Sequence, residues 1–458
     1  MLLKSLSLFL LAGAAFLPLQ AEPPSLIAIQ DARIITVSGA VLEKGTVVLR
    51  DGIIADVGAA IIIPKGAWVV DGKGLTVYPG LIDGFSTWGI PDGAPVAAPT
   101  GGRAAVAVPA PAGTPAPARS QGPADRPGTN SWVTAADLVK TSDRRLDAAR
   151  GAGFTSAATF PRPGLVGGHG ALVNLAGENA GRMVVEPGIG LLLSMGGGGY
   201  TGYPSSLMGM FSYYRQLWID AEHYKLNKEM YAQSPATIER PGYDRALEGV
   251  LAAKKVFLPA AGPMQLERAL KLAAELKATP VIYGAVEGYR MAAVLKKTAT
   301  PVILNVKWPV KDREADPERI DSIRTLELRD KAPESPAALV AAGVKFAVSS
   351  DGIDNPKDVI KALKRSIDLG LKKEDALRAL TLSAAEIHGV GARLGSIDKG
   401  KIANLVVTNG DLFDDKTKVQ MVFIDGVKYL PPPETPPAPR GGAAPSAPGN
   451  ETQEEVEH

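Results

Sequence analysis

Short apolar segments and helical segments alternate over residues 79–391, and this alternation constrains the fold more than any other feature of the sequence. Buried-strand candidates include GLIDGFS, GIGLLLSM and TPVILNV, and helical stretches stand between most of them. One such stretch, MQLERALKLAAELKA, places Leu266, Leu270 and Ala273 of the Leu272–Ala273 pair on one face. Parallel strands need a crossover connection, which a helix usually supplies. The sequence therefore predicts an α/β fold with a parallel TIM-like (β/α)8 barrel over residues 79–391.

The segments on both sides of this region have a different pattern of apolar and polar residues. Between Ile27 and Leu75, apolar and polar residues alternate in short segments that end at turns such as Asp71-Gly72-Lys73-Gly74. Short β segments return after residue 395, in KIANLVVTN and KVQMVFIDGVKYL. We expect residues 22–78 and 392–430 to build one small composite β-sandwich domain from the two ends of the chain.

Proline marks the segments that do not belong to a core. Of the 37 prolines, eight lie in residues 92–128 and eight in residues 431–458. Both segments are rich in Ala, Gly and Pro and poor in aromatic residues, so they bury too little apolar surface to offset chain ordering. The sequence predicts a disordered insertion at 92–128 within the barrel and a disordered tail at 431–458.

Residues 1–21 have the organisation of a secretory signal peptide. Lys4 precedes an apolar run from Leu6 to Leu17, and the small residue Ala21 stands before Glu22. The run is too short for a transmembrane helix, which needs about 20 residues. We expect a periplasmic or secreted protein with no membrane span after cleavage. An uncleaved anchor or a buried first strand is the alternative interpretation of the same residues.

Charge and rare residues exclude several classes of function. The chain has 50 basic and 48 acidic residues and a formal charge of +2, so nothing predicts a nucleic-acid partner. It has no cysteine, which excludes thiolate zinc sites, disulfides and a cysteine nucleophile. With four histidines in total, a histidine-built metal centre would use nearly all of them.

Two sequence motifs connect this organisation to a family. Pro79-Gly80-Leu81-Ile82-Asp83 begins the barrel region, and ALRALTLSAAEIHGVGARLGSIDKGKIANLVVTNGDLF ends it at residues 376–413. Together they resemble the amidohydrolase superfamily, in particular its imidazolonepropionase-like branch, over roughly residues 26–430 apart from the insertion. The resemblance implies a distorted barrel with a composite β-sandwich. It also implies hydrolysis of carbon–nitrogen bonds other than peptide bonds, by water activated on one or two divalent metal ions, usually zinc.

The metal-ligand positions of the family are substituted in this sequence. The His-x-His pattern that follows PGLID in relatives is here Phe85 and Thr87. The histidine of the fifth strand corresponds to Pro259 and that of the sixth to Gly284, or to Tyr283 with a one-residue shift. The fourth strand, LLLSMGGGGY, offers neither the Lys nor the Glu that bridges the metals in some relatives. Imidazole supplies most of the affinity of such sites, so we expect no metal here.

Asp351 is the one residue that fits the family pattern. It follows the eighth strand in AVSSDG, where the aspartate of active relatives binds metal and takes a proton from water. By resemblance Asp351 is the candidate catalytic residue, and no cofactor is expected. The competing interpretation is a misalignment in which other donors hold zinc or another divalent ion.

Three further residues are candidates for a pocket at the barrel mouth. His169 lies in GLVGGHGALVN, which we interpret as a Gly-rich turn after the second strand, and a loop histidine without a role is the alternative. Tyr283 follows from the alignment above. Lys307 follows the seventh strand and could form an acid–base pair with an aspartate, or a solvated ion pair. The other histidines, His223, His388 and His458, occupy no ligand position.

Three functional hypotheses remain open. The first is an exported amidohydrolase-like protein with a degenerate metal site, which binds a small-molecule ligand or supports an intact amidohydrolase as a partner. The second is an active hydrolase that uses Asp351 with atypical donors. The third is an envelope binding protein that acts through its Pro-rich segments. Because barrels of this family often associate, a homo-oligomer is also expected.

Overall fold

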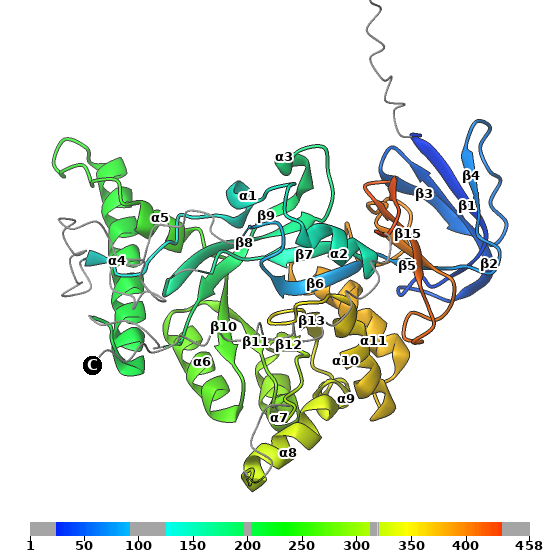
Figure 1. Cartoon of the computed structure of the whole chain (residues 1–458). Coiled ribbons are helices and arrows are strands. Elements are labelled where there is room, and N and C mark those ends of the chain that lie inside the picture. Colours follow the sequence, from blue (N-terminus) through cyan, green and yellow to red (C-terminus); the bar gives the residue numbers. More distant parts are fainter. Residues whose placement is uncertain are drawn as a thin grey trace, which may run out of the picture.

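The computed structural model describes residues 24–91, 125–162, 164–196, 203–311, 318 and 320–432. Two eight-stranded sheets organise these residues (Figure 1). The predicted signal peptide, residues 92–124 of the predicted insertion and the predicted tail from residue 433 lie outside them. The last residues of the predicted insertion are described, and among them Arg126 pairs with Asp220 and Asp244, at 3.2 and 3.0 Å.

The first sheet joins the two ends of the described chain. Its strands are β1 (Leu26–Ile34), β2 (Leu42–Arg50), β3 (Ile53–Gly58), β4 (Trp68–Asp71), β5 (Thr76–Pro79), β14 (Leu405–Thr408), β15 (Val419–Ile424) and β16 (Val427–Tyr429). They follow the order β16-β15-β14-β5-β1-β2-β3, and β4 pairs with β1. The antiparallel pair β5–β14 joins the strand before the barrel to the strand after it. The predicted composite β unit is confirmed, and its blue and orange-red strands lie together in Figure 1.

The second sheet is a nearly closed barrel. Its strands, each beside the next, are β6 (Leu81–Ser86), β7 (Phe154–Thr159), β8 (Val166–Asn174), β9 (Val184–Leu193), β10 (Lys255–Ala260), β11 (Thr279–Gly284), β12 (Val302–Asn305) and β13 (Phe346–Ser349). Strand β13 lies against β6 and brings the two ends of the sheet together. Gly84 allows this approach, because a Cβ there would lie 2.9 Å from the Val348 carbonyl oxygen. The predicted barrel is confirmed.

One segment of the barrel was predicted wrongly. The Gly-rich sequence interpreted as a turn is strand β8, which runs antiparallel to both β7 and β9, so the barrel is not wholly parallel. The glycines serve close packing instead of chain reversal. A Cβ on Gly170 would overlap the Phe160 ring, and Gly168 has a φ of 115°. A glycine inside a strand often marks such a close approach.

Helices surround the barrel and close one end of it. They are α1 (Ala135–Leu138), α2 (Arg145–Gly151), α3 (Ala180–Met183), α4 (Leu207–Gln233), α5 (Arg245–Leu251), α6 (Pro263–Glu275), α7 (Gly288–Thr298), α8 (Ile323–Lys331), η2 (Ala332–Glu334), α9 (Ser335–Ala342), α10 (Lys357–Asp368), α11 (Lys373–Leu380) and α12 (Leu382–Ile387). Within the described ranges, none of them combines the length and apolar character needed to cross a bilayer.

Side chains alternate between the inside and the outside of the barrel wall, as the pleat of a strand requires. On β11, Val281 and Tyr283 pack inside, whereas Ile282 packs outward against the helices. On β10, Phe257 is inside and Leu258 outside. The inner cluster continues into α12, whose apolar residues pack under the barrel. This alternation decides which residues reach the barrel mouth.

Candidate functional site

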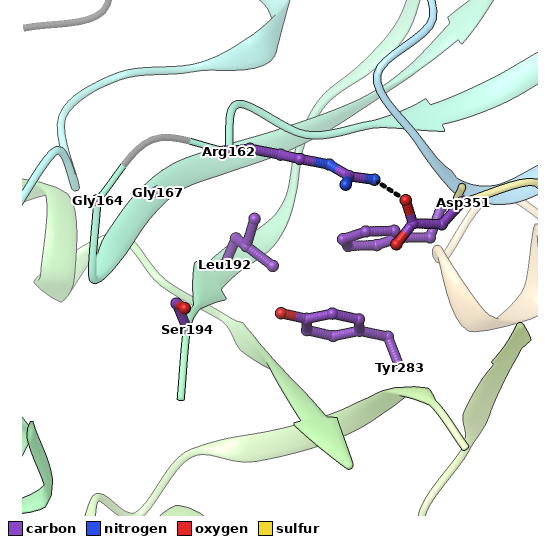
Figure 2. A pocket seen from close by; sticks show the side chains of 8 residues that line it. Arg162, Gly164, Gly167, Leu192, Ser194, Tyr283 and Asp351 are labelled. Carbon is purple, nitrogen blue, oxygen red and sulfur yellow. Dashed lines mark hydrogen bonds and ion pairs between the residues drawn. The ribbon is translucent and has the colours of Figure 1, made fainter. Parts of the chain in front are cut away.

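A small cavity lies at the carboxyl ends of the barrel strands, where barrel active sites form. Its volume is about 150 Å³. The lining residues are Phe85, Arg162, Gly164, Gly167, Leu192, Ser194, Tyr283 and Asp351 (Figure 2). They come from β6, from the ends of β7 and β9, from β8 and β11, and from the turn after β13. The predicted Phe85, Tyr283 and Asp351 therefore meet in one place.

Aromatic rings form the floor of this cavity. Phe85 stacks on Tyr283 with 4.5 Å between ring centroids and an interplanar angle of 11°. Phe85 also stacks on Phe160, with 4.8 Å between ring centroids and an interplanar angle of 25°. The hydroxyl of Tyr283 donates to the Leu193 carbonyl at 3.4 Å, and burial raises the pKa of this phenol. Tyr283 is thus a neutral donor that is already engaged with the backbone.

An ion pair spans the cavity above this floor. The Arg162 guanidinium pairs with the Asp351 carboxylate (Figure 2), and it lies 5.4 Å from the centroid of the Phe85 ring. The side chains are 43% and 28% exposed, so solvent and ligands reach both charges. The backbone of Asp351 is fixed, because its N–H donates to Ser349 Oγ at 3.0 Å and its carbonyl accepts from Asn305 at 2.9 Å. The carboxylate therefore has a cation of the chain as its partner.

A second carboxylate, Asp83, lies wholly buried below the mouth. It accepts hydrogen bonds from the backbone N–H groups of Phe85 and Ser350, both at 3.1 Å, and from the Ser350 hydroxyl. Burial raises its pKa to about 7, against the lowering effect of these hydrogen bonds. Asp83 ties β6 to the end of β13, and so it fixes the distance between Phe85 and Asp351.

The aromatic floor continues down the barrel to His388. Phe160 packs on Phe257 at 4.6 Å, and the ring of Phe257 stacks on that of His388 at 5.9 Å and 15°. His388 Nε2 lies 2.9 Å from the carbonyl oxygen of Gly84, which makes Nε2 the protonated nitrogen. Burial lowers the pKa of His388 to about 3. This histidine is a neutral core residue and lines no part of the cavity.

The residues at the family's metal positions do not fit a divalent metal centre. Phe85 and Pro259 offer no donor atom. Thr87 Oγ1 accepts from Arg145 at 2.9 Å. Pro259 pairs in register with Tyr283, so the pleat turns Tyr283 and not Gly284 toward the cavity. Within the ranges that the structure describes, no three His, Asp or Glu side chains gather as a metal site.

Two of the predicted pocket residues do not line the cavity. His169 stands in strand β8, and its Nε2 lies 2.8 Å from the Gly249 carbonyl. Burial lowers the pKa of this imidazole. His169 was a candidate for the mouth because β8 was interpreted as a turn, but as a strand residue it does not line this cavity. Lys307 packs beside Gly352 and likewise does not line the cavity.

Sequence reasoning missed Arg162, the only cation among the lining residues. A local signal was available, since an arginine three residues after the last residue of β7 stands at the end of a barrel strand. Ser194, directly after β9, was missed for the same reason. Neither position belongs to the family's metal pattern, which directed attention elsewhere.

Comparison with known proteins agrees with the fold. Residues 219–428 match the sequence profile of the amidohydrolase family. The structure is similar to an amidohydrolase from Thermotoga maritima MSB8, at 24% identity over 89% of this chain and 100% of that chain, with a TM-score of 0.71. It is also similar to a prolidase complexed with N-methylphosphonate-L-proline (17% identity, 89% and 100%, TM-score 0.53) and to molinate hydrolase (16%, 89% and 95%, 0.51). No curated protein gives a significant match.

Proposed function

Because residues 219–428 belong to the amidohydrolase family and the described chain has the amidohydrolase fold, we propose a function within this fold. The protein is exported, and its barrel binds a small molecule without metal-dependent hydrolysis. The nominal class is that of hydrolases of carbon–nitrogen bonds other than peptide bonds. The observation that carries the proposal is the stacked Phe85–Tyr283 pair, which fills metal positions with rings. Arg162 supplies the cation that Asp351 faces.

The chemistry of the cavity favours a small carboxylate with a flat apolar body. A guanidinium has five N–H donors, and its pairing with Asp351 leaves others for an incoming anion. The partly buried ring of Tyr283 also lines the cavity and offers an apolar surface beside Arg162. The volume of about 150 Å³ is comparable to cavities that accept benzene. The cavity thus combines a charge for recognition with a surface for apolar contact.

Metal content tests the first half of this proposal. We expect protein purified without a histidine tag to hold less than about 0.1 equivalents of zinc, because the described residues offer no donor set. A chelator should leave the midpoint of thermal unfolding unchanged, since no bound metal stabilises the native state. One or two equivalents of zinc, with a hydrolytic activity that chelation removes and Asp351→Asn abolishes, would instead support the active-hydrolase alternative.

A matched ligand pair tests the second half. We expect benzoate to bind at least about tenfold more tightly than the neutral benzyl alcohol, because a hydrogen bond to a charged group contributes about 1.5–3 kcal/mol. Arg162→Gln should remove this difference, whereas Lys44→Gln, at an exposed lysine of the composite sheet, should keep it. The measurement is an NMR titration of each variant. Equal affinities for the two probes in the unaltered protein would contradict the proposed recognition.

Export is proposed from the order of charged, apolar and small residues at the N-terminus. Expression with a secretion-competent bacterial host should give a mature protein that begins at Glu22, after the small residue Ala21. N-terminal sequencing of the periplasmic fraction provides the measurement. Full-length protein that stays in the cytoplasmic fraction would overturn the assignment.

A further inference from the structure

Helix α4 has two apolar faces, and among the residues that the structure describes only one of these faces is buried. Five of its residues on one face, Met210, Tyr213, Tyr214, Leu217 and Ala221, are buried against the rest of the protein. Four more apolar residues are exposed: Met208 (82%), Ile219 (58%), Leu226 (51%) and Met230 (44%). At about 100° per residue these four fall within a sector of about 40°, opposite the buried face. We name Met208, Ile219, Leu226 and Met230 the outer stripe.

The outer stripe lies at the edge of the molecule, next to a hollow. Figure 1 shows α4 on the side of the protein far from the composite β sheet. A hollow of about 330 Å³ lies beside the middle of the stripe, lined by Arg215, Trp218, Ile219, Glu222, Glu275 and Leu276. It is therefore bounded by α4 and the end of α6. Exposed apolar side chains beside a hollow with charged residues at its rim favour a protein interaction site.

The charges around the stripe select a second copy of the same chain as the partner. Arg215 and Glu222 stand at equal distances along the helix from the point between Trp218 and Ile219. If two α4 helices pack antiparallel about a two-fold axis at this point, Arg215 of each copy comes opposite Glu222 of the other. The same operation brings Phe211 opposite Leu226. A two-fold interface must be self-complementary in this way.

Existing ion pairs extend this complementarity. Arg215 already pairs with Glu275 at 2.6 Å, and Glu222 pairs with Lys277 at 3.1 Å. In the antiparallel arrangement the charges alternate across the interface, from Lys277 and Glu222 of one copy to Arg215 and Glu275 of the other. No like charges are brought together along this row. We propose that the protein forms a two-fold symmetric homodimer through the outer stripe of α4, independently of what the barrel binds.

Charge reversal on the full chain tests this dimer. We expect analytical ultracentrifugation of the unaltered protein at about 50 µM to give a dimer, a concentration suited to micromolar affinity. Arg215→Glu places Glu opposite Glu twice, and Glu222→Arg places Arg opposite Arg twice. Like charges across an interface cost several kcal/mol, so each variant alone should dimerise at least about tenfold more weakly.

Mixing the two variants separates an interface effect from a folding effect. In a heterodimer of Arg215→Glu with Glu222→Arg, both contacts become Glu opposite Arg, so an equimolar mixture should recover the dimer. Lys225→Glu, the same charge change on α4 away from the outer stripe, should leave the unaltered dimer intact. A monomeric unaltered protein, single variants that dimerise fully, or a mixture that stays monomeric would each overturn the proposal. A barrel that binds no carboxylate would leave it untouched.

Discussion

Asp83→Ala should lower the free energy of unfolding by about 4 kcal/mol, which makes it one of the two most damaging single substitutions that we predict. The variant leaves the N–H groups of Phe85 and Ser350 and the Ser350 hydroxyl without their acceptor inside the barrel wall. Each unsatisfied buried group costs about 1–3 kcal/mol. The contact between β6 and the end of β13 loses its polar link as well. Urea unfolding followed by circular dichroism measures the change.

Asp83→Asn is the matched control. The amide oxygen keeps the acceptor for the two backbone N–H groups, and the amide NH₂ can donate to the Ser350 hydroxyl, which then turns to accept. We expect a loss of less than about 1.5 kcal/mol, since both backbone N–H groups keep their acceptor. If the Ala and Asn variants lose the same stability, the hydrogen bonds of Asp83 are not what holds the two strands together.

The same pair of variants makes a prediction about pH. The pKa of Asp83 is raised to about 7, so folded Asp83 keeps a proton that the unfolded chain has released, and its contribution to stability falls as the pH rises from about 4 to 7. The pKa of His388 is lowered to about 3, so the unfolded chain takes up a proton that folded His388 refuses. That contribution is lost as the pH falls from about 6.5 toward 3.

Between about pH 4 and 6.5, the stability contributions of Asp83 and His388 therefore change with pH in opposite directions. Asp83→Asn removes one of them and leaves the other. Between pH 6.5 and 4.5 the variant should therefore lose about 2 kcal/mol more stability than the unaltered protein, at about 1.4 kcal/mol per pKa unit and per proton. Urea unfolding at the two pH values gives both differences. Parallel pH dependences of the two proteins would contradict the raised pKa of Asp83.

Phe85→Ala should lower the free energy of unfolding by about 3–5 kcal/mol, as is usual for removing a buried phenylalanine. Phe85 is 2% exposed and touches three partners at once: the Tyr283 ring, the Phe160 ring and the Arg162 guanidinium. The variant removes two aromatic stacks and leaves a void in the floor of the cavity. Urea unfolding again measures the effect. A position that binds metal in relatives contributes here to the stability of the barrel.

Two further substitutions at Phe85 sharpen this test. Phe85→Leu keeps much of the apolar volume and should cost clearly less than Phe85→Ala, because the cost follows the void that remains. Phe85→His reintroduces the ligand type of the family, but Pro259 and Tyr283 still supply no partner donor for a metal. It should be destabilising without binding zinc. A Phe85→His variant that gains one equivalent of zinc would show that the barrel mouth is still built for a metal.

Local sequence patterns were sufficient for most of the barrel wall. Strands β10 to β13 are short apolar runs followed by helices, and such a pattern needs no distant contact to be recognised. The prediction for strand β8 was wrong because three of its residues are glycines, which favour turns by local preference. The glycines are explained by close neighbours instead: a Cβ on Gly170 would meet the Phe160 ring, and one on Gly167 or Gly168 would meet Pro161. Packing between strands overrode local propensity at this point.

The sequence alone determined the fold, through the strand–helix alternation and the two family motifs. It also determined that the side chains of Phe85 and Pro259 cannot bind metal, because they carry no donor atom. Only the tertiary structure decided that Tyr283 faces the cavity, that Arg162 meets Asp351 across 189 residues of chain, and that α4 keeps an exposed outer stripe. The physical reason is the range of the interactions. Donor chemistry and periodicity belong to single residues and neighbouring turns, whereas an ion pair or a free helix face exists only after distant strands and helices have packed.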